Sequence, residues 1–190
     1  MSQNEIKEAL EVLKKGGLII CNTDTIPALA CDATNPAAVN RLLELTRRPK
    51  GTGLVMLACD MDMVARYVKN IPPIALEVAE VSATPLTIIY PQGIGLAPGT
   101  EASDGSVAIR IPGNDFCTIL TRKLNRPIVA TIPATGNTKS TFRLCMEEIS
   151  DEILDNVDWV TKYSDLPDMT CSVSSIISLG EGGEVKIIRK

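Results

Sequence analysis

Short apolar runs alternate with longer amphipathic stretches along most of this chain. Short β-branched runs between turn signals predict strands, and apolar positions recurring at helical spacing predict helices. Strands are therefore predicted at Leu18–Cys21, Leu54–Ala58, Pro85–Tyr90, Ser106–Pro112, Pro127–Ile132, Asp158–Lys162, Ser174–Leu179 and Val185–Arg189, with a second short apolar segment ending at Cys31. Helices are predicted at Glu5–Lys15, Pro36–Arg48, Asp60–Lys69, Pro72–Val81, Asp115–Leu124 and Ser150–Val157. This alternation, closed by a hairpin turn at 181–183, predicts a single α/β domain over residues 1–190, with helices packed on one twisted sheet of parallel and antiparallel strands.

A polar turn follows the first predicted strand. Asn22–Thr25 carries two hydroxyls, Thr23 and Thr25. The next helix begins after Asn35, a good N-cap, and ends at Arg47 and Arg48, where unpaired carbonyls and the helix dipole favour cations. One folded unit thus brings hydroxyls and guanidinium groups together, which suits a small molecule that carries phosphate or carboxylate.

The composition removes several classes of chemistry. The chain has no histidine, so the commonest general base and metal ligand is missing and a Ser-His-Asp or Cys-His arrangement is excluded. Its six cysteines are scattered without a CxxC pair, which favours buried reduced thiols over a metal site. The 3% aromatic content argues against base-stacking platforms, and the net charge of −4 provides no overall attraction to nucleic acid. Neither a GxGxxG nor a P-loop motif occurs.

The N-terminus reads as an amphipathic helix and no apolar run is long enough to span a membrane, so we predict a cytoplasmic protein without membrane partners.

Arg110 interrupts an otherwise apolar strand. Burying an unpaired guanidinium is costly, so Arg110 should face either a carboxylate partner or an anionic ligand. Serines at strand and loop ends could join the two threonines in one polar pocket: Ser106, Ser140, Ser174 and Ser175. The residues alone therefore predict a hydroxyl- and arginine-lined pocket for an anionic small molecule.

Several segments resemble the motifs of one enzyme family in their order along the chain. Asn22–Asp32 is similar to the PTET-x-YGLG-C-D motif of the YrdC-type threonylcarbamoyl-AMP synthase family, and Thr46–Pro49 to its K-x-R-P motif. Its GP-x-T, VA-x-R-x-P, ST-x-V-D and I-x-R motifs have counterparts at Thr84–Thr87, Val107–Pro112, Ser174–Leu179 and Ile187–Arg189. The resemblance covers essentially the whole chain and implies the YrdC-like fold.

The resemblance implies a nucleotidyltransferase. Its reaction would convert L-threonine, bicarbonate and ATP to threonylcarbamoyl-adenylate and pyrophosphate, for threonylcarbamoyladenosine modification of tRNA. Thr25, Arg110 and Ser174 would contact threonine. Contacts to ATP would come from Arg48, Thr52, Ser106, Ser140 and Arg189. Mg²⁺ would be held mainly by the nucleotide, without a metal site in the protein.

The chain departs from the family pattern at several positions. Thr46 replaces a lysine, Pro27-Ala28 replaces Tyr-Gly, and Ser178 replaces an aspartate. In the loop after residue 130, Ile132 stands for a serine and Ala134 for an asparagine. These changes leave two alternatives open. One is a non-catalytic protein of the same fold that binds tRNA or double-stranded RNA with a basic concavity formed by Arg47, Arg48, Lys50 and Arg110. The other is a paralogue that uses a different carboxylate substrate.

Overall fold

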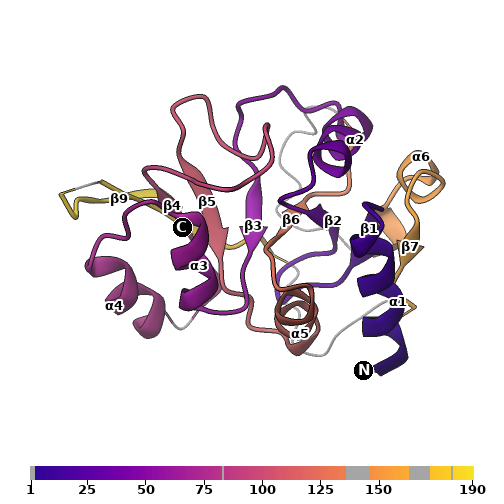
Figure 1. The fold of residues 1–190 in the computed structure, drawn as a ribbon, viewed down its shortest axis with the longest axis horizontal. Coiled ribbons are helices and arrows are strands. Elements are labelled where there is room, and N and C mark those ends of the chain that lie inside the picture. The colour runs from indigo at the N-terminus through magenta and orange to yellow at the C-terminus, as the bar shows by residue number, and fades with distance from the viewer. Residues whose placement is uncertain (1–2, 83, 136–145, 163–171, 181) are drawn as a thin grey trace.

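A single mixed sheet organises the protein (Figure 1). The computed structural model describes residues 3–82, 84–135, 146–162, 172–180 and 182–190. Nine strands in these residues join in the order β7-β1-β2-β6-β3-β5-β4-β8-β9. Their bounds are β1 Ile19–Cys21, β2 Ala28–Asp32, β3 Val55–Leu57, β4 Leu86–Tyr90, β5 Val107–Arg110, β6 Ile128–Thr131, β7 Trp159–Val160, β8 Ser175–Leu179 and β9 Val185–Arg189. The pairs β1·β7, β3·β5 and β4·β8 are parallel and the other neighbouring pairs are antiparallel, so the predicted mixed sheet is confirmed.

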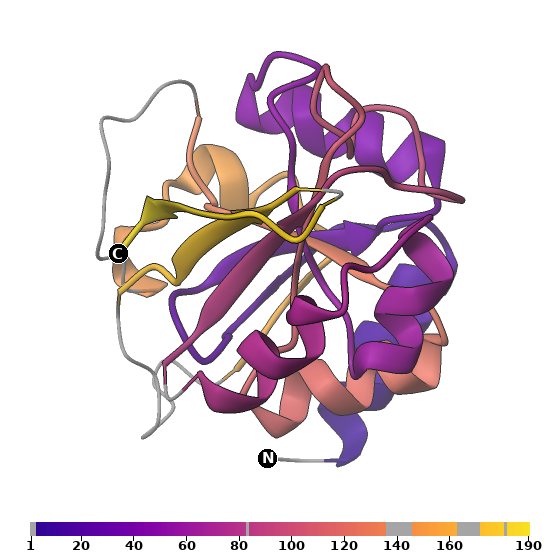
Figure 2. The ribbon, with the colours of Figure 1, turned by 90° about the vertical axis from the view of Figure 1, so that its left-hand side faces the viewer.

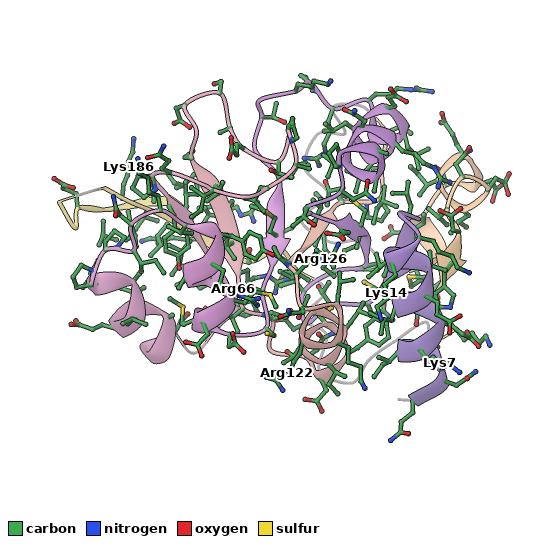
Figure 3. The ribbon with its side chains drawn as sticks, in the orientation of Figure 1. Lys7, Lys14, Arg66, Arg122, Arg126 and Lys186 are labelled. Carbon is green, nitrogen blue, oxygen red and sulfur yellow. The ribbon has the colours of Figure 1, made fainter. Side chains whose placement is uncertain are left out.

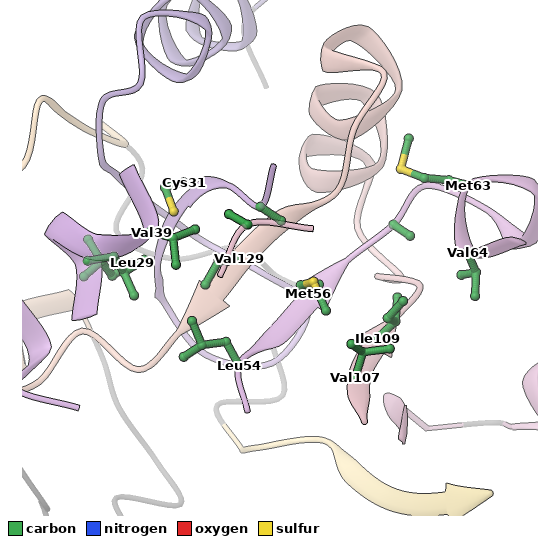
Figure 4. Close-up of a cluster of buried hydrophobic side chains, with 14 of the residues drawn as sticks. Leu29, Cys31, Val39, Leu54, Met56, Met63, Val64, Val107, Ile109 and Val129 are labelled. Atoms are coloured by element: carbon green, nitrogen blue, oxygen red, sulfur yellow. The ribbon is translucent and has the colours of Figure 1, made fainter. Parts of the chain in front are cut away.

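Helices cover both faces of this sheet. They are α1 Gln3–Lys14, α2 Pro36–Thr46, α3 Met61–Tyr67, α4 Ile74–Val81, α5 Asp115–Leu124 and α6 Asp151–Leu154, with a 3₁₀ turn at Met146–Glu148. α1 and α5 pack in one apolar cluster that includes Ile19, Leu57 and Ile128. α2, α3 and α4 pack in the larger cluster on the alternate strand residues, among them Met56 and Ile109 (Figure 4). Because successive strand residues point to opposite faces, the strands β1, β2, β3 and β6 supply both clusters.

Local capping chemistry sets the limits of α2. The Asn35 side chain accepts hydrogen bonds from the backbone N–H groups of Ala37 and Ala38, at 3.0 and 3.1 Å, and Pro36 begins the helix. At the other end Arg47 adopts a left-handed conformation with φ of 51°. The Arg48 N–H group then bonds back to the Leu43 carbonyl at 3.0 Å. This chain reversal separates the directions of the two consecutive arginines.

The predicted elements all occur, with shorter bounds at several of them. The helix predicted at Ser150–Val157 is only the four-residue α6, and the strand predicted at Asp158–Lys162 is the two-residue β7. The C-terminal strands form the predicted antiparallel hairpin, shown in yellow in Figure 2. The loop predicted after residue 130 is described as far as residue 135, and residues 136–145 lie outside the described residues. Among the described residues, no helix has the length and apolar character needed to cross a membrane.

Candidate substrate-binding site

A cavity of about 240 Å³, named here the arginine cavity, lies where the polar turn meets the ends of several strands. Its walls come from the turn before β2, the segment after α2, and strands β3, β5, β6, β8 and β9. Its lining comprises Thr23, Thr25, Ile26, Pro27, Ala28, Arg48, Gly53, Val55, Arg110, Ala130, Thr131, Ile132, Val173, Ser174, Ile176 and Arg189. The volume lies below the roughly 300–1,000 Å³ of common ligand sites, so the cavity fits an amino acid or one portion of a nucleotide.

The structure brings five of the eight predicted site residues together. The arginine cavity is lined by five of them: Thr25, Arg48, Arg110, Ser174 and Arg189. These residues come from positions as far apart as 25 and 189, and the sheet order accounts for their convergence.

Three predicted residues are not part of this lining. The Thr52 hydroxyl donates to the Pro49 carbonyl at 3.0 Å, although the neighbouring Gly53 lines the cavity. Ser106 precedes β5 and is four residues from Arg110, about 13 Å along an extended strand. Ser140 lies outside the described residues. Contacts from these three to a ligand therefore remain predictions.

Arg110 has the carboxylate partner that its position requires. It forms an ion pair with Asp24, in which the two side chains are only 4% and 11% exposed. The second Asp24 oxygen accepts from the Gly113 N–H group at 2.9 Å. Arg110 Nη2 donates to the Thr25 hydroxyl oxygen at 3.2 Å. The sequence indicated that Arg110 needs a partner, but it did not identify Asp24. The feature that could have pointed to Asp24 is its acidic side chain within a segment that is otherwise expected to be buried.

The two threonine hydroxyls form a chain with a defined direction. The Thr23 hydroxyl donates to the Ile26 carbonyl at 2.8 Å, and this uses its single proton. The Thr25 hydroxyl, 2.7 Å from it, must therefore be the donor of the pair. Arg110 also donates to the Thr25 oxygen. A ligand thus meets Thr25 as a hydrogen-bond acceptor, which suits an N–H group.

Arg189 is held by the backbone at the start of β8. Its Nε and Nη2 atoms donate to the Ser174 carbonyl at 2.9 and 2.7 Å. The Ser174 hydroxyl lies 2.8 Å from that of buried Thr87. Partial burial lowers the pKa of the Arg189 guanidinium from its usual value. An anion beside this group would gain from the incomplete hydration of the cation.

The two arginines at the end of α2 have different environments. Arg48 lines the arginine cavity, and burial lowers the pKa of its guanidinium. Its side chain has no hydrogen bond or ion pair with the described residues, so it is available to a ligand. Arg47 is exposed and forms an ion pair with Glu152 at 2.6 Å. Arg47 and Lys50 are not among the lining residues.

Some of the positions that depart from the family pattern line the arginine cavity, and others do not. Pro27, Ala28 and Ile132 line the arginine cavity and make part of its wall apolar. Thr46 is fully buried, and its hydroxyl donates to the Leu42 carbonyl within α2 at 2.7 Å. Ala134 and Ser178 are not lining residues. Two polar side chains of the family, a tyrosine and a serine, are therefore replaced by Pro27 and Ile132 in the wall itself. The Thr46 side chain instead bonds within its own helix.

The described cysteines are buried free thiols at positions 21, 31, 59 and 117. Burial, with a smaller contribution from Asp32, raises the pKa of the Cys31 thiol well above its usual value. No three His, Cys, Asp or Glu side chains of the described residues are grouped as a metal site would require. The residues that line the arginine cavity offer hydrogen bonding and charge neutralisation by arginines and hydroxyls.

A buried arginine and an acceptor hydroxyl at the strand ends of a mixed sheet define an α/β protein with a cavity that suits an anionic small molecule. The chain belongs to the Sua5/YciO/YrdC family, whose model, described as telomere recombination, matches residues 11–190.

Relatives and solved structures agree with this assignment. The chain is 30% identical over 150 residues to the threonylcarbamoyl-AMP synthase of Hahella chejuensis, covering 76% of this chain and 80% of that protein. A double-substitution variant of P. abyssi Sua5 superposes with a TM-score of 0.87 at 20% identity, covering 100% of this chain and 57% of that one. P. abyssi Sua5 complexed with L-threonine superposes with a TM-score of 0.81 at 21% identity, covering 94% of this chain and 52% of that one. E. coli YciO superposes with a TM-score of 0.80 at 21% identity, covering 100% of this chain and 90% of that one. The chain thus spans about half of the P. abyssi protein, and these three structures establish the fold.

Proposed function

We propose that this protein is a threonylcarbamoyl-AMP synthase. L-Threonine, bicarbonate and ATP would give threonylcarbamoyl-adenylate, pyrophosphate and water. The main support for this proposal is that five predicted site residues line one cavity: Thr25, Arg48, Arg110, Ser174 and Arg189. The name of the Hahella chejuensis relative and the L-threonine complex of P. abyssi Sua5 support the same substrate.

Each group in the cavity suits one part of the substrates. The Thr25 oxygen accepts from the amino group of threonine, because its own proton is committed to Thr23. Arg110, which contacts Thr25, and Ser174, which lines the same cavity, would hold the substrate carboxylate. Arg48, whose guanidinium has no partner among the described residues, contacts the phosphates together with Arg189. The rate would come from positioning the reactants and neutralising charge rather than from a side-chain base.

ATP exceeds the volume of the arginine cavity, so only its phosphate end would enter. The rest would extend past Gly53, the neighbour in sequence of the predicted contact Thr52. Mg²⁺ would arrive with the nucleotide, since the lining offers cations and hydroxyls and no carboxylate cluster. The product would feed modification of tRNA in the cytoplasm, and the tRNA partner and this compartment remain predictions.

The RNA-binding alternative has less support from the charges around the cavity. Arg47 is paired with Glu152 and Arg110 with Asp24, so two of its four proposed cations are neutralised. Other basic side chains lie on α1, α3 and α5 and in the turn after α5, and they do not line the cavity. Figure 3 labels five of them: Lys7, Lys14, Arg66, Arg122 and Arg126.

Calorimetric titration with Mg-ATP, with and without threonine and bicarbonate, tests the proposal. We expect ATP binding that strengthens with threonine, followed by pyrophosphate release. Binding that is indifferent to threonine would favour the paralogue with another carboxylate substrate, which the apolar wall at Pro27 and Ile132 makes the second candidate. Absence of nucleotide binding would refute both catalytic proposals.

Arg48→Ala and Arg47→Ala form a matched pair for the site. Removal of Arg48 should weaken ATP binding by about 10-fold or more, the value of one charge-assisted contact, with little change in stability. Arg47→Ala removes the same charge one residue away, from an exposed ion pair, and should leave ATP affinity within about 2-fold. Equal effects of the two variants would show that only general charge matters.

A further inference from the structure

The C-terminal strand β9 forms one edge of the sheet. β9 ends the strand order on one side and β7 on the other, and Figure 1 shows β9 at the left end of the sheet. β7 has only two residues, and a short edge strand offers few unpaired backbone groups to another chain. β9 has five residues, and the first four of them are exposed. β9 is therefore the longer of the two edges that the described strands leave unpaired.

Three large apolar side chains are exposed on this edge. Of the six that are exposed among the described residues, β9 carries Val185, Ile187 and Ile188, which are 49%, 59% and 50% exposed. Val185 is paired with Leu179 and Ile187 with Ile177, and both of these β8 residues are buried in the larger apolar cluster. Paired residues of neighbouring strands point to the same face. The apolar face of the sheet thus continues from its buried strands onto exposed residues of β9.

The hydrogen bonds of the hairpin show which backbone groups of β9 face outward. The Gly180 N–H group donates to the Glu184 carbonyl at 2.8 Å. In an antiparallel pair, alternate residues of a strand bond to its neighbour, so Lys186 bonds inward to β8. Val185 and Ile187 therefore present their N–H and C=O groups to the free edge. A strand that pairs here must place its own hydrogen-bonding residues opposite these two.

We propose that β9 pairs antiparallel with β9 of a second copy of this chain, about a two-fold axis at Val185. The outward backbone groups of the two Val185 residues then face each other and exchange two hydrogen bonds. The same register places Glu184 directly opposite Lys186 of the second copy, and the two-fold axis produces this pair twice. Opposite charges on facing strands favour pairing. This charge complementarity of β9 with itself is the reason to assign the edge to a second copy.

Two other axes would also place outward groups opposite each other, and both are less favourable. An axis at Lys186 sets two lysines directly opposite each other, and like charges oppose strand pairing. An axis at Ile187 sets Val185 opposite Arg189. The register of β9 shifts after Ile187, so that Arg189 lies opposite Ile176 and bonds inward as Lys186 does. Its backbone groups are therefore not available at the free edge.

The dimer joins the two nine-stranded sheets into one. Val185 packs against its counterpart, and Ile187 lies over Gly183 of the second copy, where no side chain competes for the space. Because only a short part of each strand pairs, the interface is at the small end of specific interfaces, and we expect a dissociation constant of about 10–100 µM. The residues that pair do not line the arginine cavity, so this inference is independent of the proposed function.

Sedimentation velocity of the full chain between about 1 and 500 µM tests the dimer. We expect a reversible equilibrium between monomer and dimer. A protein that is still monomeric at about 500 µM would overturn the proposal. Assemblies that keep growing beyond a dimer would also overturn it, because a two-fold pairing of β9 is closed.

Charge reversals test the register. Glu184→Lys sets lysines opposite each other at both ends of the paired segment and should weaken the dimer about 10-fold, and Lys186→Glu should do the same with glutamates. The double variant restores opposite charges and should dimerise within about 3-fold of the wild type. Lys7→Glu makes the same change in net charge as Lys186→Glu, at an exposed position of α1, and should leave the dimer intact. Weakened single variants without recovery in the double variant would overturn this register.

Val185→Pro tests the backbone pairing. Proline lacks an N–H group, and at position 185 the lost group is the outward one, so the hydrogen bonds between β8 and β9 remain. The variant should stay monomeric at about 500 µM, with folding checked by urea unfolding. A folded Val185→Pro protein that dimerises like the wild type would overturn the proposed pairing. If this variant does not fold, the charge reversals still decide, and failure of ATP to bind would refute the proposed function alone.

Discussion

Asp24→Asn is the substitution whose cost follows most directly from the structure. It removes the charge that faces Arg110 in an ion pair whose side chains are 11% and 4% exposed. Breaking such a buried pair by removing one partner costs about 3–5 kcal/mol, since the remaining charge stays uncompensated. Asparagine keeps one carbonyl oxygen for Gly113 or Arg110, so we expect the lower value, about 3 kcal/mol. Domains are stable by only about 5–15 kcal/mol, so this loss is a large fraction of the total.

Urea unfolding of Asp24→Asn and of a matched control measures this cost. With an m-value of about 2 kcal/mol/M, the midpoint should fall by about 1.5 M. Glu152→Gln makes the same carboxylate-to-amide change in the Arg47 ion pair, whose side chains are 63% and 47% exposed. Exposed pairs contribute at most about 1 kcal/mol, so its midpoint should fall by less than about 0.5 M. Equal shifts for the two variants would refute the argument that burial makes the Asp24 ion pair important.

Other predictions concern groups away from the arginine cavity. Burial raises the pKa of Tyr90 from 10.0 to about 12. The unfolded chain therefore loses this proton first, and the wild type should lose about 1.4 kcal/mol between about pH 9 and pH 11 relative to Tyr90→Phe. Parallel pH profiles in urea unfolding would contradict this. A hydrogen bond with Cys21 and complete burial raise the pKa of the Cys117 thiol, so iodoacetamide should label Cys117 only after unfolding, and labelling of the native protein would show access. Asn35→Ala should cost about 1 kcal/mol through loss of the α2 cap, and Asn35→Ser should restore most of it, as urea unfolding would show.

Local patterns predicted the elements because local chemistry sets them. The start of α2 could be predicted from Asn35 and Pro36, since capping involves only neighbouring backbone groups. The lengths of α6 and β7 could not be predicted from the sequence, because both are short segments whose extent depends on tertiary contacts. The polar residues Thr25, Arg110 and Ser174 were identified as site candidates from their types and from the family motifs they match.

The sequence by itself determined the alternation of strands and helices, the inventory of arginines and hydroxyls, the absence of histidine chemistry and the need of Arg110 for a partner. Only the tertiary structure decided that this partner is Asp24, 86 residues away, and that Arg48 enters the cavity while Arg47 pairs with Glu152. The physical reason is that residue type and spacing fix what a segment can form and what it must satisfy. Which distant segments meet depends on the order of strands β3-β5-β4-β8-β9, and that order is set by packing of the whole chain.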